Sequence, residues 1–174
     1  MHIRPSRMTQ YLPALETLVL CHLAATPIAD AVAALSDEAR TALAAGHLAH
    51  LVTTNADGTP QVSIVWIGLE DDEIVVASLG PRQKLRNVLR DPRVAVSLET
   101  GGTGPFGLDE YLVVYGTGRI TEGGGPELLK RLAEVYIGPG VKFPPMDDPP
   151  PGYILRITPG RLAGVGPWGS VPER

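Results

Sequence analysis

The chain has 174 residues, 44% of them hydrophobic and 20% charged, which suits one globular domain and argues against disorder. A net charge of −4 makes it a poor general binder of nucleic acid or of an anionic membrane, and no stretch has the about 18–20 apolar residues that span a bilayer. The single cysteine, Cys21, excludes an internal disulfide and fits a reducing compartment, so we expect a cytoplasmic protein.

Residues 1–35 differ from the rest because they are rich in Ala and Leu and contain no glycine. The apolar-leaning run Leu12–Ala25 is interrupted by polar residues, and no A-x-A cleavage pattern follows it, so we do not expect a secretory signal. We expect an N-terminal extension over 1–35, either an appended helix or poorly ordered, followed by one domain over 36–174.

The domain begins with a predicted helix. Ser36 is a typical N-cap, Asp37 and Glu38 follow in the first turn, and Gly46 is a natural stop. Further helices are expected over Pro81–Arg90 and Pro126–Tyr136. Strands are expected over His47–Thr54, Thr59–Gly68, Glu73–Ser78, Arg93–Glu99, Glu110–Thr121, Tyr153–Thr158 and Arg161–Val165, with irregular segments over Thr100–Leu108 and Gly138–Gly152.

These elements predict a mainly β fold with short helices (α+β), of six or seven strands. Tight turns join most of the strands, so the sheet should be largely antiparallel. A closed or partly closed barrel is the expected way to hide its edges.

A basic segment, Ser78–Asn87, joins the end of a strand to the start of a helix. Free backbone N–H groups at a helix N-terminus bind anions, and Gly80 allows a close approach of the backbone. Arg82 and Lys84 add positive charge, and the Ser78 hydroxyl is a further donor. The pattern predicts either a phosphate site or a solvated basic helix face.

Side chains for catalysis or metal binding are scarce. His47 and His50 fall on opposite faces of a strand, so we expect no metal site. No nucleophile, acid or base is evident, which leaves catalytic residues unknown and favours chemistry carried by a cofactor. Near the C-terminus, Trp168 lies among glycines, where it either stacks on a planar ring or fills a core or dimer groove.

Several short runs resemble the split-barrel family related to pyridoxamine 5′-phosphate oxidase, and most closely its branch of coenzyme F420-dependent (deazaflavin) reductases of actinobacteria. The runs are Gly46-His47-Leu48-Ala49, Asp57-Gly58-Thr59-Pro60-Gln61-Val62-Ser63, Arg82-Gln83-Lys84-Leu85-Arg86-Asn87, Asp91-Pro92-Arg93-Val94 and Gly164-Val165-Gly166-Pro167-Trp168. They keep their order and lie within residues 36–168.

The resemblance implies a six-stranded antiparallel split β-barrel of the FMN-binding type. It also implies a homodimer with cofactor sites at its interface. The strand residues expected to line the cofactor ring are Val62, Ser63, Ile64, Val65 and Trp66. Those expected at its phosphate end are Ser78, Arg82, Gln83, Lys84 and Asn87, and Pro167 and Trp168 would approach from the partner subunit.

The cofactor implied is coenzyme F420, with FMN as the alternative. FMN-binding relatives carry a basic strand of the type Arg-x-x-x-Leu-Lys, whereas the equivalent run here, Gln61–Trp66, has no charge. We therefore expect a reductase that passes a hydride from reduced F420 to an unsaturated small organic substrate. The rivals are an FMN-dependent enzyme like pyridoxamine phosphate oxidase and a non-enzymatic flavin or deazaflavin carrier. Tyr111, Tyr115 and water are candidate proton donors.

Overall fold

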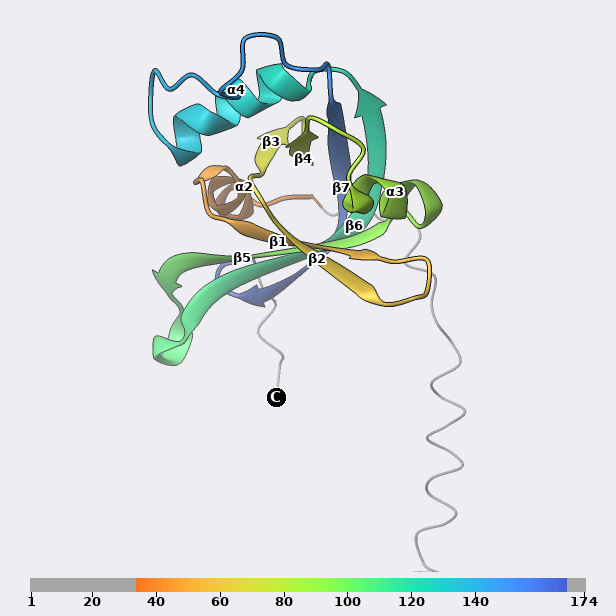
Figure 1. Ribbon diagram of the computed structural model, residues 1–174. Helices are drawn as coiled ribbons and strands as arrows, with labels where there is room; N and C mark the ends of the chain where they lie inside the picture. Colours follow the sequence, from red (N-terminus) through yellow and green to blue (C-terminus); the bar gives the residue numbers. More distant parts are fainter. Residues whose placement is uncertain (1–33, 169–174) are drawn as a thin grey trace, which may run out of the picture. The chain divides into compact units, whose positions relative to one another are not determined.

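The computed structural model describes residues 34–168 (Figure 1). The predicted extension therefore lies outside the described residues, apart from its last two positions. The helices are α2 (Asp37–Ala44), α3 (Gln83–Arg90) and α4 (Gly125–Tyr136), with a short 3₁₀ turn at Pro105–Gly107. The strands are β1 (Ala49–Thr54), β2 (Pro60–Val65), β3 (Gly68–Glu70), β4 (Glu73–Ser78), β5 (Arg93–Thr103), β6 (Asp109–Glu122) and β7 (Tyr153–Val165).

Helix α2 begins and ends where the sequence predicts. The Ser36 side chain accepts a hydrogen bond of 3.2 Å from the backbone N–H of Ala39, as an N-cap does. Beyond the last turn, Gly46 has φ +83°, a conformation that favours glycine. The helix buries Ala39 and Leu43 against the sheet, so the cap and the apolar stripe together hold it in place.

The strands form one sheet in the order β2-β1-β5-β6-β7-β4-β3, and every pairing is antiparallel. The predicted antiparallel arrangement is confirmed, but the six strands implied by the resemblance become seven. The predicted strand Thr59–Gly68 divides into β2 and β3, and the two predicted C-terminal strands form the single strand β7. The sheet does not close, because β2 and β3 are its two edges although only Trp66 and Ile67 separate them in the chain.

The two faces of the sheet differ sharply. The inner face carries the core, which includes Leu51, Val96, Leu112, Val114 and Ile157, all fully buried or nearly so. In Figure 1, α2 lies over this face of β1 and β5, and no helix of residues 34–168 covers the opposite face of β2, β1 and β5. That second face is called here the outer face.

Tyr136 links the junction of β2 and β3 to the residues just before β1. Its hydroxyl donates to the backbone carbonyl of His47 at 2.9 Å and accepts from the N–H of Ile67 at 2.9 Å. The ring stacks on Trp66, with 5.1 Å between centroids and 14° between planes. One side chain from α4 thus holds the β2–β3 junction against the start of β1, where the strand hydrogen bonds stop.

We expect Tyr136→Phe to lower the free energy of unfolding by about 1–3 kcal/mol, because the N–H of Ile67 loses a half-buried partner while the ring stack on Trp66 remains. Urea denaturation of both proteins measures the difference. Tyr115→Phe on the outer face is the control and should change stability by less, since no hydrogen bond of its hydroxyl is found within residues 34–168.

Candidate functional site

The loop between β4 and α3 is shaped by bonds within itself. Ser78 is 6% exposed, and its hydroxyl donates to the carbonyl of Gly80 at 2.8 Å. The backbone N–H of Arg82 donates to the same carbonyl at 2.8 Å. Ser78 was predicted to hold a phosphate, but its hydroxyl is already used to shape this turn and is nearly buried.

The N-terminus of α3 has no cap. Its N-cap residue, Arg82, makes no side-chain capping bond, and no acidic residue lies in the first turn. The N–H groups of Leu85 and Arg86 donate to the carbonyl of Arg82, whereas no acceptor in residues 34–168 is found for those of Gln83 and Lys84. Two backbone donors and the positive end of the helix dipole are therefore open to an anion.

Unpaired cations are concentrated on this helix. Of the cationic side chains in residues 34–168, those without an ion pair to a described carboxylate are Arg82, Lys84, Arg86, Arg90, Lys130 and Arg161. Four of the six belong to α3 and its N-cap. Burial, and then the neighbouring charge of Arg82, lower the pKa of Lys84. A bound anion would favour the charged form of Lys84 and so offset both effects.

Gln83 and Asn87 lie one helical turn apart on α3 and are both engaged by protein groups. Arg86 donates to Gln83 Oε1 at 2.9 Å and to the carbonyl of Pro81 at 2.8 Å. Asn87 is fully buried and bonds with side chains of Gln83, Thr53 and Asn55. The direct cofactor contact predicted for Asn87 would need an exposed atom, and Asn87 has none.

Strand β2 presents its apolar side chains to the outer face. Val62 and Ile64 are 53% and 56% exposed, whereas Val65 is 7% exposed and belongs to the core. Ser63 is opposite the buried Leu51 and so faces inward. Trp66 lies under α4, between the rings of Tyr136 and Phe143. Of the five residues predicted to line a ring, Val62 and Ile64 are therefore the ones on the open surface.

The outer face continues from β2 across the sheet. Its rows follow the strand register, and the residues are Val62 and Ile64 on β2, His50 and Val52 on β1, Ala95, Ser97 and Glu99 on β5, Tyr111, Val113 and Tyr115 on β6, and Arg161, Ala163 and Val165 on β7. Arg161 packs over the Tyr115 ring at 4.0 Å from the centroid. This mostly apolar surface includes both tyrosines that the sequence offered as proton donors.

Trp168 folds back on its own chain. Its indole N–H donates to the carbonyl of Tyr111 at 2.9 Å, and its ring lines a cavity of about 450 Å³ between α2 and the β5–β6 hairpin. Pro167, beside it, is exposed. Glu38 and Glu110 line the same cavity, so Trp168 lies in acidic surroundings, apart from the cations of α3 in the same chain. Its predicted contact with a partner's cofactor stays a prediction.

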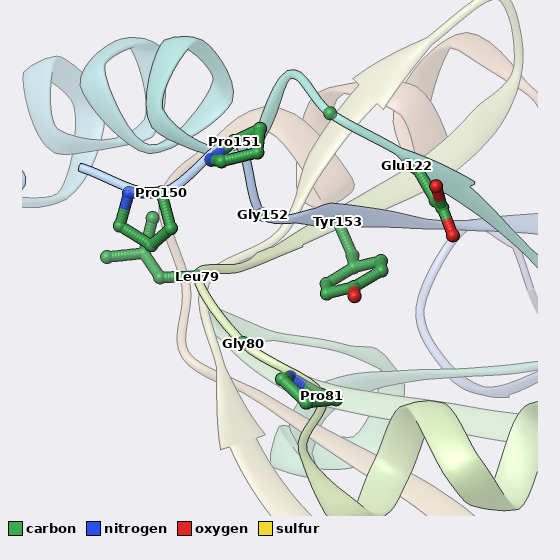
Figure 2. Close-up of a pocket in the computed structure, with 9 residues that line it drawn as sticks. Leu79, Gly80, Pro81, Glu122, Pro150, Pro151, Gly152 and Tyr153 are labelled. Carbon is green, nitrogen blue, oxygen red and sulfur yellow. The ribbon is translucent and has the colours of Figure 1, made fainter.

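A cavity of about 480 Å³ adjoins the β4–α3 loop, and Figure 2 shows its walls. It is lined by Leu79, Gly80, Pro81, Glu122, Gly123, Pro150, Pro151, Gly152 and Tyr153. Three distant segments of the chain meet there, so no local motif marks the cavity in the sequence. Its only charged wall residue is the acidic Glu122, so the cavity itself offers no cation to an anion, whereas Arg82 and Lys84 follow Pro81 in the same loop and helix start.

Side chains of the 138–152 segment are engaged by neighbouring residues. Lys142 is ion-paired with Asp147 at 2.5 Å, and Phe143 packs on Trp66 at 5.0 Å between ring centroids, so both belong to the folded 138–152 loop. Within residues 34–168, His, Cys, Asp and Glu side chains form no cluster of three or more that could hold a metal ion. None of the helices in that range has the length and apolar character needed to cross a membrane.

The chain was compared with curated proteins and with solved structures. A search of curated proteins found no significant match. Among solved structures, an F420 reductase is 26% identical, with a TM-score of 0.60 over 74% of this chain and 98% of its own. A conserved hypothetical protein from Mycobacterium tuberculosis, Rv2991, is also 26% identical, with a TM-score of 0.60 over 78% and 88% of the two chains.

A FAD-binding protein from Mesorhizobium loti is 20% identical, with a TM-score of 0.53 over 75% of this chain and 94% of its own, and supports the fold alone. The sequence profile of the pyridoxamine 5′-phosphate oxidase family matches residues 35–166. That range includes all of the described helices and strands and the whole of the β4–α3 loop. The split-barrel fold predicted from the resemblance is confirmed, and the chain belongs to the pyridoxamine 5′-phosphate oxidase family.

Proposed function

We propose that two copies of this chain bind coenzyme F420 at their interface and use its reduced form to transfer a hydride to an unsaturated small organic substrate. One observation carries the proposal: helix α3, whose uncapped N-terminus holds the unpaired cations Arg82 and Lys84, is hydrogen-bonded through Asn87 and Asn55 to the turn before β2, the strand with exposed apolar residues. In a phosphate-bearing cofactor with a planar ring, the phosphate matches the helix end and the ring matches the apolar strand.

The donor set fits the phosphate of such a cofactor. The N–H groups of Gln83 and Lys84 and the two cations can bind a phosphate without displacing a described ion pair. The absence of charge on β2 favours the deazaflavin over FMN, and likeness to an F420 reductase at 26% identity supports the same choice. Both lines of support are independent of the dimer.

The outer face supports the dimer. Val62 and Ile64 on the edge strand are about half exposed, and Val52, Val113 and Ala163 extend the apolar surface across the sheet. A second copy is the expected cover, because a two-fold axis places the same patch on both subunits. Covering this face would also shield the ring-binding residues from water.

The chain's own residues bind and orient rather than react. Lys84 and the α3 N–H groups hold the phosphate end, Val62 and Ile64 supply an apolar wall, and the partner's outer face excludes water. When bound, the reduced cofactor supplies the hydride. Tyr111 and Tyr115 carry the phenolic hydroxyl groups on the outer face, and these can give a proton to the product.

A binding titration of purified protein with F420 and FMN in parallel tests the cofactor. We expect the tighter binding for F420, followed by oxidation of reduced F420 with a panel of enones and quinones. Tighter binding of FMN would replace the proposal by the FMN-dependent alternative. Tight F420 binding with no turnover on the panel would favour a carrier.

The lowered pKa of Lys84 predicts how phosphate recognition varies with pH. Its ammonium form binds the anion, so affinity falls as pH rises through its pKa, and this occurs at a lower pH than for an exposed lysine. We expect the ratio of FMN to riboflavin affinity to decline as the pH rises, at a lower pH than an exposed lysine would produce, and to stay flat in Lys84→Arg. The ratio cancels titration of the ring itself. An equal decline in Lys84→Arg would assign the effect to another group.

A further inference from the structure

A line of hydrogen bonds connects α3 with the turn between β1 and β2. Arg86 Nη2 donates to Gln83 Oε1 at 2.9 Å, and Gln83 Nε2 donates to Asn87 Oδ1 at 2.8 Å. Asn87 Nδ2 then donates to Asn55 Oδ1 at 3.0 Å, and Asn55 Nδ2 donates to Thr59 Oγ1 at 3.2 Å. The line crosses from the helix that carries the anion site to the residue that precedes β2.

The direction of these bonds is fixed at both ends. The guanidinium of Arg86 can only donate, and an ionised carboxylate can only accept. The line ends where Thr59 Oγ1 donates to Asp57 Oδ1 at 2.6 Å, and the bonds from Thr59 hold the pKa of Asp57 below its usual value. Each side-chain amide between them therefore has one orientation in which it both accepts from one neighbour and donates to the next. Turning any one amide over would break bonds on both sides of it.

Asn87 is the buried centre of the line. It is fully buried, and Thr53, to which its Nδ2 also donates at 3.0 Å, is 2% exposed. Its Oδ1 accepts a second bond from Arg90 at 3.3 Å. With two bonds given and two received, no polar atom of Asn87 is left for a ligand, although it lies one helical turn from Gln83.

We propose that Asn87 is a positioning residue, which fixes the phosphate-binding end of α3 relative to the ring-binding strand β2. The proposal rests on the function proposed above and assigns Asn87 a role other than contact. Through Gln83, Asn87 keeps Arg86 turned back onto the carbonyl of Pro81. The first turn of α3 is thereby held open for the anion, at a set distance from the residues that contact the ring.

Breaking the line should separate recognition of phosphate from recognition of the ring. Asn87→Ala removes the centre, and Asn55→Ala breaks the line from the turn side, at a partly exposed residue that lies outside the anion site. In each variant we expect the preference for a phosphate-bearing ring over its phosphate-free form to fall about tenfold, the effect of one misplaced charge-assisted contact. Ring affinity itself should change little.

The experiment measures dissociation constants of F420 and FMN, each against its phosphate-free ring compound, for the full chain and its variants. Leu89→Ala, at a position on α3 that is 75% exposed, is the control and should leave the preference unchanged. A preserved preference in folded Asn87→Ala and Asn55→Ala, or an equal loss for both ligand forms, would overturn the proposal. If Asn87→Ala does not fold, Asn55→Ala decides alone.

The design also separates this inference from the proposed function. If the native chain binds no flavin or deazaflavin, the cofactor proposal fails, and inorganic phosphate then serves as the probe. Backbone amide shifts of Gln83 and Lys84 on phosphate addition should appear in the native chain and be lost in Asn55→Ala. Equal shifts in both proteins, or none in the native chain, would overturn the positioning role.

Discussion

Replacing Lys84 by alanine should weaken the binding of F420 and of FMN by on the order of ten- to a hundredfold, the range expected for one lost charge-assisted hydrogen bond. The reason is local: Lys84 is half-buried at the uncapped start of α3, and no ion pair with a described carboxylate neutralises it. Riboflavin, which has no phosphate, should lose little affinity. Fluorescence titration gives all three constants.

Lys130→Ala is the matched control for this prediction. Lys130 is also a lysine without an ion pair among the described residues, but it is exposed on α4. Its removal changes the net charge by the same amount and should leave all three constants unchanged. If Lys130→Ala weakens phosphate ligands as much as Lys84→Ala does, the effect is one of overall charge, and α3 is not the phosphate site.

Local chemistry explains which parts of the fold could be predicted. The Ser36 cap and the Gly46 stop act within a few residues, so they specify α2 without help from elsewhere. Strand β4 agrees with the predicted Glu73–Ser78 for the same reason, since turn residues border a short β-branched run. These signals depend only on residues within or next to the segment, so the sequence of that segment is enough to predict it.

The parts that could not be predicted depend on distant partners. The break between β2 and β3 lies at Ile67, whose N–H is bonded to Tyr136, 69 residues later. The continuous strand β7 depends on its long pairing with β6, which runs past the irregular register at Tyr115 and Gly116. The hydrophobic periodicity of a segment predicts neither the β2–β3 break nor the continuity of β7, because each depends on a contact with another helix or strand.

In the candidate site, too, local features could be predicted and contacts between distant residues could not. The charges of Arg82 and Lys84 and the start of a helix are visible in the sequence, and the structure brings them together. Residue type alone could not show that the side chains of Ser78 and Asn87 form hydrogen bonds with other protein groups. The partner of Asn87 in the β1–β2 turn, Asn55, was missed because the two lie 32 positions apart.

Ile64→Lys should convert the proposed dimer to monomer and abolish tight cofactor binding, although Lys84 and α3 are untouched. Ile64 is 56% exposed on β2 in the single chain, and the proposed two-fold interface would bury it in both copies. Burying an unpaired ammonium costs on the order of 3 kcal/mol or more, and a two-fold interface would bury one from each copy. Sedimentation velocity measures the state of association, and an F420 titration of the same sample measures binding.

Ile137→Lys is the matched control, because Ile137 is 53% exposed but follows α4, outside the outer face defined by the strand register. It should leave both association and binding unchanged. A dimer that survives Ile64→Lys would remove the outer face from the interface. A monomer that still binds F420 tightly would keep α3 as the phosphate site and show that one chain completes the cofactor site by itself.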